Sequence, residues 1–199
     1  MGLHANRRRL SKQESKKVAL AAARAILIEE GPQSVTLKAV AARIDRTHAN
    51  LLHHFGSAQG LQLELAELIG QQITTKIRDT VSDARRGEAD PALIVNLTFD
   101  AFAKEGAGPL ASWMILNGDA EALSPILKAI NSLVNDLTDA DHPNVAQTTL
   151  ALVLAALGDA LLGGPMASEL NLPRDTARKL ALQQLISMGG ADYQRRSAA

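Results

Sequence analysis

The stretch that decides the fold runs from residue 16 to residue 61 and reads KKVALAAARAILIEEGPQSVTLKAVAARIDRTHANLLHHFGSAQGL. Its first half predicts a helix, begun by a cap at Ser11 or Ser15, because apolar residues recur with the spacing of one helix face, at Ala19, Ala22, Ala23, Ile26 and Leu27. Gly31 and Pro32 follow Glu30, and Pro cannot continue a helix. The first helix is therefore predicted to end at Glu30.

Two short helices are predicted next. Thr36 is an N-cap candidate for a helix over residues 36–44, and Thr47 caps a second one that carries Leu51 and Phe55. Asp45 separates them, since Asp tolerates a left-handed turn conformation better than most residues. Two short helices joined by a tight turn, behind a supporting helix, form a helix-turn-helix, whose second helix enters the DNA major groove.

The predicted recognition helix begins with side chains suited to DNA. Asn50 can bond adenine through two hydrogen bonds, His48 can donate or accept, and Ala49 leaves room for a close approach. Basic residues around it are candidate phosphate or base contacts, namely Lys12, Lys16, Lys17, Lys38, Arg43 and Arg46. The predicted DNA-binding residues are Lys38, Arg46, Thr47, His48, Ala49, Asn50, His53 and His54.

Charge is distributed unevenly along the 199 residues. The whole chain has 21 Lys and Arg against 21 Asp and Glu, but residues 1–60 hold ten of the bases and four of the acids. The first 60 residues therefore carry +6 and the remainder −6, which favours a polyanion as the partner of the N-terminal end. An ordinary solvated basic tail is the alternative for the run Arg7–Arg9.

The composition predicts an all-α fold of about nine helices. Ala and Leu are abundant, only five residues are aromatic, and no stretch alternates as a strand would. Helices are expected at residues 58–86, 91–106, 109–117, 121–138, 144–163 and 174–188, with Gly163-Gly164-Pro165 as one of the joints. The expected organisation is a basic arm (1–15), a helix-turn-helix domain (16–56) and a helical effector-binding and dimerisation domain (57–199).

The quoted stretch resembles the DNA-binding domain of the tetracycline-repressor (TetR) family. The matching positions include Thr36, Val40-Ala41, Thr47, His54-Phe55 and Leu61, in about 45 residues without gaps. The resemblance implies a homodimeric transcriptional regulator, most often a repressor, that binds double-stranded DNA and responds to a small molecule.

Four positions depart from the family's usual pattern. The turn has Asp45-Arg46 where the family has Gly-Val, Leu52 replaces a phosphate-contacting Tyr, and Ala58 replaces a Lys. Arg46 and the Arg7–Arg9 arm can compensate, because phosphate contacts are largely interchangeable charges. The alternative is a TetR-like ligand-binding or adaptor protein with weak DNA affinity.

The larger domain is expected to hold the effector pocket and the dimer surface. Pockets are mostly apolar with a few polar anchors, so the largest available side chains are the candidates, with ordinary core packing as the alternative. The predicted ligand-binding residues are Phe99, Phe102, Trp113, Met114 and Asn117. Near the C-terminus an apolar stripe resembles the family's dimerisation helix, and its predicted interface residues are Leu150, Val153, Leu154, Leu157 and Leu161.

Other classes of protein find little support. The absence of Cys excludes disulfides and thiolate metal sites, and no phosphate loop or hydrolase motif occurs. We expect no enzyme, cofactor or metal, and interpret Asp139, Asp141 and His142 as a turn cap. The apolar run Leu150 to Gly158 is too short for a bilayer and is followed by Asp159, so a cytoplasmic protein without membrane contact is expected.

Overall fold

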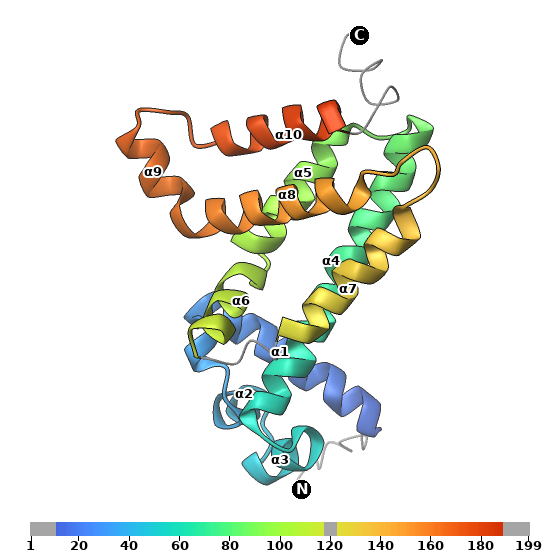
Figure 1. Ribbon diagram of the computed structural model, residues 1–199. Coiled ribbons are helices and arrows are strands. Elements are labelled where there is room, and N and C mark those ends of the chain that lie inside the picture. Colours follow the sequence, from blue (N-terminus) through green and yellow to red (C-terminus); the bar gives the residue numbers. More distant parts are fainter. Residues whose placement is uncertain (1–10, 118–122, 189–199) are drawn as a thin grey trace, which may run out of the picture. The chain divides into compact units, whose positions relative to one another are not determined.

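The computed structural model describes residues 11–117 and 123–188, which divide into two compact units at Leu65 and Ala66. The described residues contain helices and no strand, which confirms the all-α prediction (Figure 1). The α-helices are α1 (Lys12–Glu30), α2 (Leu37–Arg43), α3 (His48–Phe55), α4 (Ala58–Arg86), α5 (Pro91–Ala103), α6 (Ala107–Leu116), α7 (Ser124–Leu137), α8 (Val145–Gly158), α9 (Gly164–Glu169) and α10 (Thr176–Met188).

Helix α1 begins at a complete capping box. The Ser11 hydroxyl accepts from the Glu14 backbone N–H at 3.1 Å, and the Glu14 carboxylate accepts from the Ser11 N–H at 2.7 Å. This exchange satisfies two helix-terminal donors and lowers the pKa of Glu14. The predicted apolar stripe is buried, and the helix ends at Glu30 as predicted.

The turn between α2 and α3 has the geometry that its sequence predicts. Asp45 has a positive φ of 51°, and the Arg46 N–H donates to the Ala41 carbonyl at 2.9 Å. The hydroxyls of Thr36 and Thr47 accept from the backbone N–H groups three residues ahead, which starts α2 and α3. The N-terminal unit is therefore a helix-turn-helix supported by α1.

The boundary between α5 and α6 differs from the prediction. Helix α5 ends at Ala103 rather than Gly106, and α6 begins at Ala107 rather than Pro109. Gly106 has a φ of 92°, a conformation that favours glycine, and it turns the chain directly into α6. Pro109 fits inside the first turn of α6, where its missing N–H has no partner to lose.

The predicted joint at Gly163-Gly164-Pro165 is wrong. Helix α8 continues through a π-helical turn (Asp159–Gly163) into α9, giving one helix of 25 residues. Gly163 and Gly164 keep helical backbone angles, and Pro165 lies in the first turn of α9. With α8 and α9 taken as one, the described residues form nine α-helices, beside the short 3-10 turn Pro32–Ser34.

Helices α5, α8 and α10 pack on one another in the C-terminal unit (Figure 1). Arg178 of α10 anchors this packing, because its Nη2 donates to Asp100 at 2.6 Å and its Nη1 to Asn96 at 3.1 Å. Its guanidinium also lies 5.2 Å from the centre of the Phe99 ring, within range of a cation–π interaction. The two units are joined through α4, whose residues fall partly in each.

Of the predicted basic arm, residues 1–10 lie outside the described residues, so Arg7–Arg9 has no structural account. The structural division after Leu65 falls inside α4, whereas the sequence placed the change of role after residue 56. The assignment of effector binding and dimerisation to residues 57–199 stays a prediction.

Candidate DNA interface and ligand cavity

Helix α3 buries one face and presents the other. Leu51 and Phe55 are buried against the rest of the N-terminal unit. The first turn of α3 is exposed, together with the two residues before it, and the exposed set is Arg46, Thr47, His48, Ala49 and Asn50. In a helix-turn-helix, the N-terminal residues of the second helix are the ones that reach base edges, and here they are exposed.

Thr47 has a structural task besides any DNA contact. Its hydroxyl accepts from the Asn50 backbone N–H at 3.2 Å, which caps α3 and leaves the hydroxyl hydrogen available. The Asn50 side chain is held at the exposed start of the helix by the same turn. A short polar side chain at this position can form the bidentate bond with adenine that the sequence predicted.

Two of the candidate phosphate contacts are ion-paired within the N-terminal unit. Lys16 lies 2.6 Å from Glu64 and over the Phe55 ring, and Arg43 lies 2.5 Å from Glu29. These pairs hold α1 against α2 and the start of α4. Lys12, Lys17, Lys38 and Arg46 are exposed. The sequence could not distinguish the two groups, because the acidic partners lie 14 and 48 residues away in the chain.

The adjacent His53 and His54 have different environments. His53 is exposed, whereas His54 is half-buried. Burial lowers the pKa of His54, and the nearby charges of His53, Lys12 and Lys16 lower it further. His54 is therefore held neutral near pH 7 and packs as an uncharged side chain beside α1.

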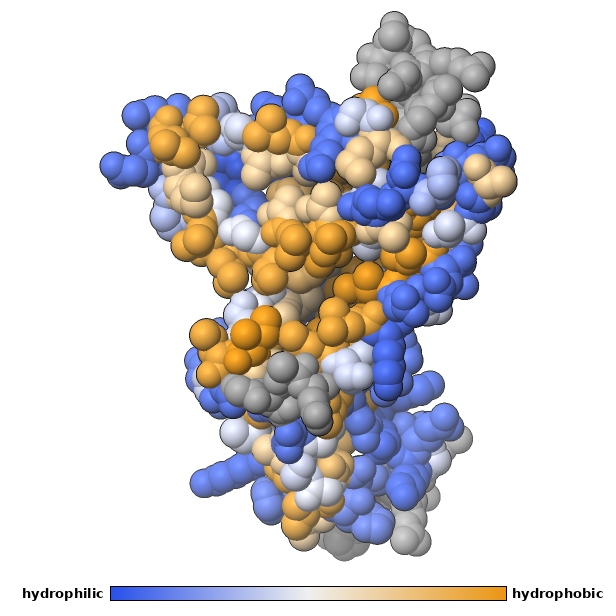
Figure 2. Space-filling view, viewed as in Figure 1, coloured by the Kyte–Doolittle hydropathy of each residue, from blue (hydrophilic) through white to orange (hydrophobic). Residues whose placement is uncertain are grey.

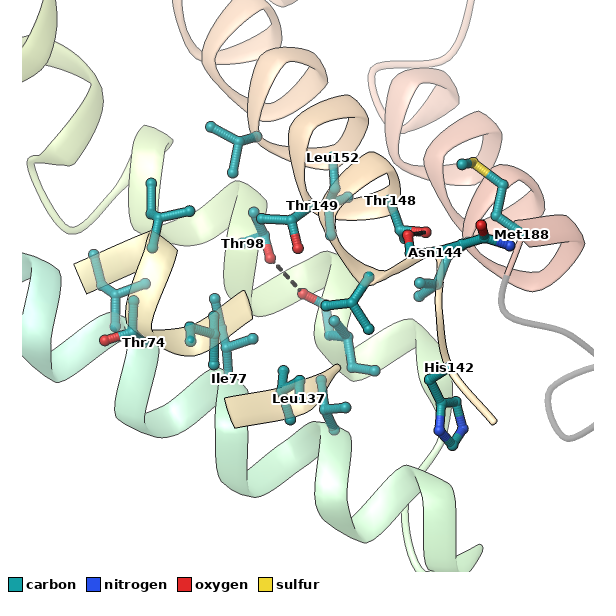
Figure 3. Close-up of a pocket in the computed structure, with 18 of the residues that line it drawn as sticks. Thr74, Ile77, Thr98, Leu137, His142, Asn144, Thr148, Thr149, Leu152 and Met188 are labelled. Atoms are coloured by element: carbon teal, nitrogen blue, oxygen red, sulfur yellow. Dashed lines mark hydrogen bonds between the residues drawn. The ribbon is translucent and has the colours of Figure 1, made fainter. Parts of the chain in front are cut away.

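The C-terminal unit contains an apolar cavity of about 340 Å³ (Figure 3). Its walls come mostly from α4, α5, α7, α8 and α10, with Ala107 of α6 and residues 141–144, and the lining side chains are mostly branched and aliphatic. This volume lies in the range of pockets that enclose small ligands. Ile77, Leu137 and Leu152 are among the residues that line it in Figure 3.

Only one of the five predicted ligand-binding residues lines this cavity. Phe102 does, but Phe99 and Met114 are buried in the core. Trp113 is half-buried outside the lining, and the exposed Asn117 donates from its side chain to the Trp113 carbonyl at 2.8 Å. The expectation that the five converge on one pocket is therefore not met. The prediction chose the largest side chains, which mostly pack in the core, whereas medium-sized aliphatic side chains line the cavity.

Polar side chains gather at one end of the cavity. Arg85 donates to the Leu137 carbonyl at 2.7 Å and lies 3.3 Å from Asp139. The Asp139 carboxylate also accepts from the Asp141 and His142 backbone N–H groups and contacts the His142 ring at 2.8 Å. The bond with His142 lowers the pKa of Asp139. This cluster caps the turn after α7, as its sequence predicted.

The predicted dimer surface is partly exposed in the single chain. Leu150, Leu154 and Leu161 are exposed, Leu157 is half-buried, and Val153 lines the cavity. Leu180 of the last helix, which the sequence also placed beside this stripe, is exposed, and sequence reasoning missed further exposed apolar residues around α9, namely Leu162, Met166, Leu170 and Leu172. Figure 2 shows apolar side chains gathered along the α8–α9 segment.

The apolar helix in this segment is longer than the sequence predicted. The continuous helix Val145–Glu169 is long and apolar enough to cross a bilayer by length and composition, and 11% of its most apolar 18-residue window is buried. The sequence predicted a run that was too short because Asp159 was expected to interrupt it. Asp159 does not end the helix, because its carboxylate is buried against Arg174.

The exposed recognition helix on a supported helix-turn-helix defines a DNA-binding protein. Residues 19–65 match the model of the bacterial regulatory proteins of the tetR family, which confirms the predicted resemblance for the N-terminal unit. The match covers the helix-turn-helix and the start of α4, so it assigns the N-terminal unit to transcriptional regulation.

Solved structures resemble the whole fold. One is the crystal structure of Mycobacterium smegmatis BioQ, with 21% identity, a TM-score of 0.53, and coverage of 86% of this chain and 95% of that one. Another is a protein of unknown function from Rhodococcus sp. RHA1, with 18% identity, a TM-score of 0.62, and coverage of 90% and 96%. At these identities the likeness establishes the fold alone. No curated protein matches the chain.

Proposed function

We propose that this protein is a cytoplasmic transcriptional repressor, which binds an operator as a homodimer and is released by a small hydrophobic effector. The observation that carries the proposal is an apolar cavity of about 340 Å³ in a chain whose other unit is a tetR-family DNA-binding domain. The DNA-binding domain would act on transcription, and the cavity is large enough to bind a small molecule that controls it.

The proposed DNA contacts are the eight residues predicted from the sequence. Arg46 and Lys38 would contact phosphates, while His48, Ala49 and Asn50 would face base edges. Two-fold symmetry of a dimer would favour an inverted repeat, with half-sites about one helical turn apart or a little more. Release would follow if the effector binds only the DNA-incompetent conformation, because ligand and DNA binding are then one linked equilibrium.

The proposed dimer would cover the exposed apolar residues of α8 and α10. Leu154 of α8 is 59% exposed and Leu180 of α10 is 59% exposed. A four-helix bundle made by two copies would remove both side chains from water. Small residues between them, such as Ala151 and Ala155, would allow the helices to approach closely.

Helix α4 offers a route between effector and DNA-binding domain. Its first residues, 58–65, belong to the N-terminal unit, and its later residues from Ile69 to Arg85 line the cavity. An effector that shifts these later residues would act on the same helix that begins in the helix-turn-helix unit.

A second candidate is an adaptor with weak DNA affinity. It is favoured by Leu52, which is 43% exposed on α3 where the family usually has a phosphate-contacting Tyr, and by the exposed Ala58. Selection of bound fragments from genomic DNA, followed by mobility shifts, separates the two. A preferred inverted repeat, released by a hydrophobic compound, supports the repressor. No preferred site at low salt supports the adaptor.

A further inference from the structure

The cavity is elongated along α4. The α4 residues that line it recur every four positions, at Ile69, Ile73, Ile77, Val81 and Arg85. This spacing marks one face of a helix, and sixteen residues at 1.5 Å each span roughly 24 Å. A ligand that fills such a cavity is long and narrow.

Three of the four threonines in the lining use their hydroxyl hydrogens on their own helices. Thr74 donates to the Gly70 carbonyl at 2.9 Å, Thr98 to Ile94 at 2.8 Å and Thr148 to Asn144 at 2.9 Å. Such bonds to the carbonyl four residues back leave little for a ligand beyond a lone pair. These hydroxyls behave as part of the apolar wall.

Thr149 is the exception in this wall. Its hydroxyl has no hydrogen bond among the described residues, although it follows Thr148 on the same helix. Figure 3 shows the Thr149 side chain entering the cavity from α8. Thr149 therefore offers both a donor and an acceptor, in a wall that otherwise offers few.

The charged side chains at the polar end of the cavity do not favour a charged ligand. Arg85 and Asp141 line the cavity there with opposite charges, so neither sign of charge on a headgroup is favoured over the other. Both Nη atoms of Arg85 are already engaged, with Leu137 and Asp139, and its Nε is buried from the cavity. A charge placed deeper would be desolvated among aliphatic side chains without compensation.

From these features we infer that the effector is an elongated, uncharged, apolar molecule with one hydroxyl or carbonyl oxygen, which Thr149 binds. The inference rests on the proposed function, in which this cavity is the effector site. Thr149 fixes the position of the ligand's oxygen, and the apolar wall receives its chain.

Calorimetric titration of the full chain at pH 7 tests this with four compounds of one chain length: 1-octanol, 2-octanone, octanoate and octylammonium. The neutral pair should bind, and each ion should bind at least about tenfold more weakly. Thr149→Val keeps the side-chain shape and should weaken octanol binding by about three- to tenfold, the size of one net hydrogen bond. Thr149→Ser keeps the hydroxyl and should retain the affinity.

Thr148→Val is the matched control, because its hydroxyl is bound to Asn144. It should lower octanol affinity less than Thr149→Val does, with the melting temperatures of both valine variants measured without ligand. Tighter binding of either ion, equal effects of the two valine variants, or no binding of the neutral pair would overturn the inference. Operator release by some other compound would then still support the repressor. Thr149-dependent binding without release would instead count against the repressor and leave the inference standing.

Discussion

The Nη1 atom of Arg174 lies 2.5 Å from Oδ1 of Asp159, and this pair ties the segment before α10 to the π-helical turn after α8. Asp159 is 5% exposed, so Arg174 is what makes a buried carboxylate tolerable there. The same carboxylate explains Gly163, since a Cβ at that position would lie 2.1 Å from Oδ1.

Replacing Arg174 with Met should lower the free energy of unfolding by about 1–3 kcal/mol, because it leaves the buried Asp159 carboxylate without its partner. Denaturant titration at fixed protein concentration measures the change. Lys179→Met is the control, since its ion pair with Asp175 is exposed and should contribute well under about 1 kcal/mol. Equal losses in the two variants would show that the Asp159 pair has no special role.

Gly163→Ala should also destabilise the C-terminal unit, by about 1–3 kcal/mol, because the added Cβ displaces Asp159 or its partner. Gly158→Ala is a matched control in the same helix, since a Cβ there meets no atom within 4 Å. That variant should be neutral or stabilising, as Ala is the better helix former. Thermal unfolding of both variants decides the matter.

Arg46→Ala should weaken binding to all DNA sequences alike, and Asn50→Ala should relax preference at one base pair by about 1–3 kcal/mol. Binding should also fall steeply as salt rises, because basic residues concentrate in the N-terminal segment. Mobility shifts with single-base operator variants measure each effect. Arg43→Ala is an informative comparison, since its guanidinium is paired with Glu29 and should matter less for salt dependence.

His54 should make the N-terminal unit less stable in mild acid. Its pKa is lowered in the folded chain, chiefly by burial, from an ordinary value near 6.5. Below that value the unfolded chain takes up a proton that the folded chain does not, so the free energy of unfolding falls as the pH falls. Above it, both states are neutral and His54 adds no pH dependence. His54→Gln should flatten the curve of unfolding free energy against pH between about pH 7.5 and 5.5, and an unchanged curve would contradict this role for His54.

Leu154→Glu should prevent dimerisation, because it would bury an unpaired charge between two copies. Sedimentation velocity at micromolar concentration should show a dimer for the wild type and a monomer or aggregate for the variant. Leu116→Glu is the control, since Leu116 is 84% exposed on α6, away from the proposed bundle. A wild-type monomer would contradict the dimer and the inverted-repeat operator together.

The sequence predicted those features that depend on neighbouring residues. Ser11, Thr36 and Thr47 cap helices through bonds that reach three residues ahead, and Asp45 turns the chain by its own backbone preference. All are visible in a short window of sequence. The helix-turn-helix could therefore be placed within a residue or two.

The cavity could not be predicted in this way. Its lining joins Ile69 of α4 with Met188 of α10, and no local pattern marks a side chain as facing a void rather than a core. Phe99 and Thr149 show the difficulty, since the large ring fills the core and the small polar side chain faces the cavity. The prediction of a joint at Gly163-Gly164-Pro165 was wrong for a related reason. Arg174, which is distant in the sequence, stabilises the π-helical turn through which the helix continues.

Ile77→Trp should abolish the response to hydrophobic effectors without abolishing operator binding. Ile77 lies midway along the α4 wall, and a larger ring there would occupy the space that the ligand needs. The tryptophan ring would fill the cavity permanently. The operator affinity of the variant without effector therefore shows whether a filled cavity favours the DNA-binding or the DNA-incompetent conformation, because an occupant that fits both equally shifts neither. Affinity like that of the wild type, with no release, places the effector in the cavity. Loss of operator binding in the absence of any effector would contradict this prediction. Trp113→Leu is the comparison, since Trp113 lies outside the lining and its loss should leave both operator binding and release intact. If Ile77→Trp responds to effectors as the wild type does, the effector binds elsewhere.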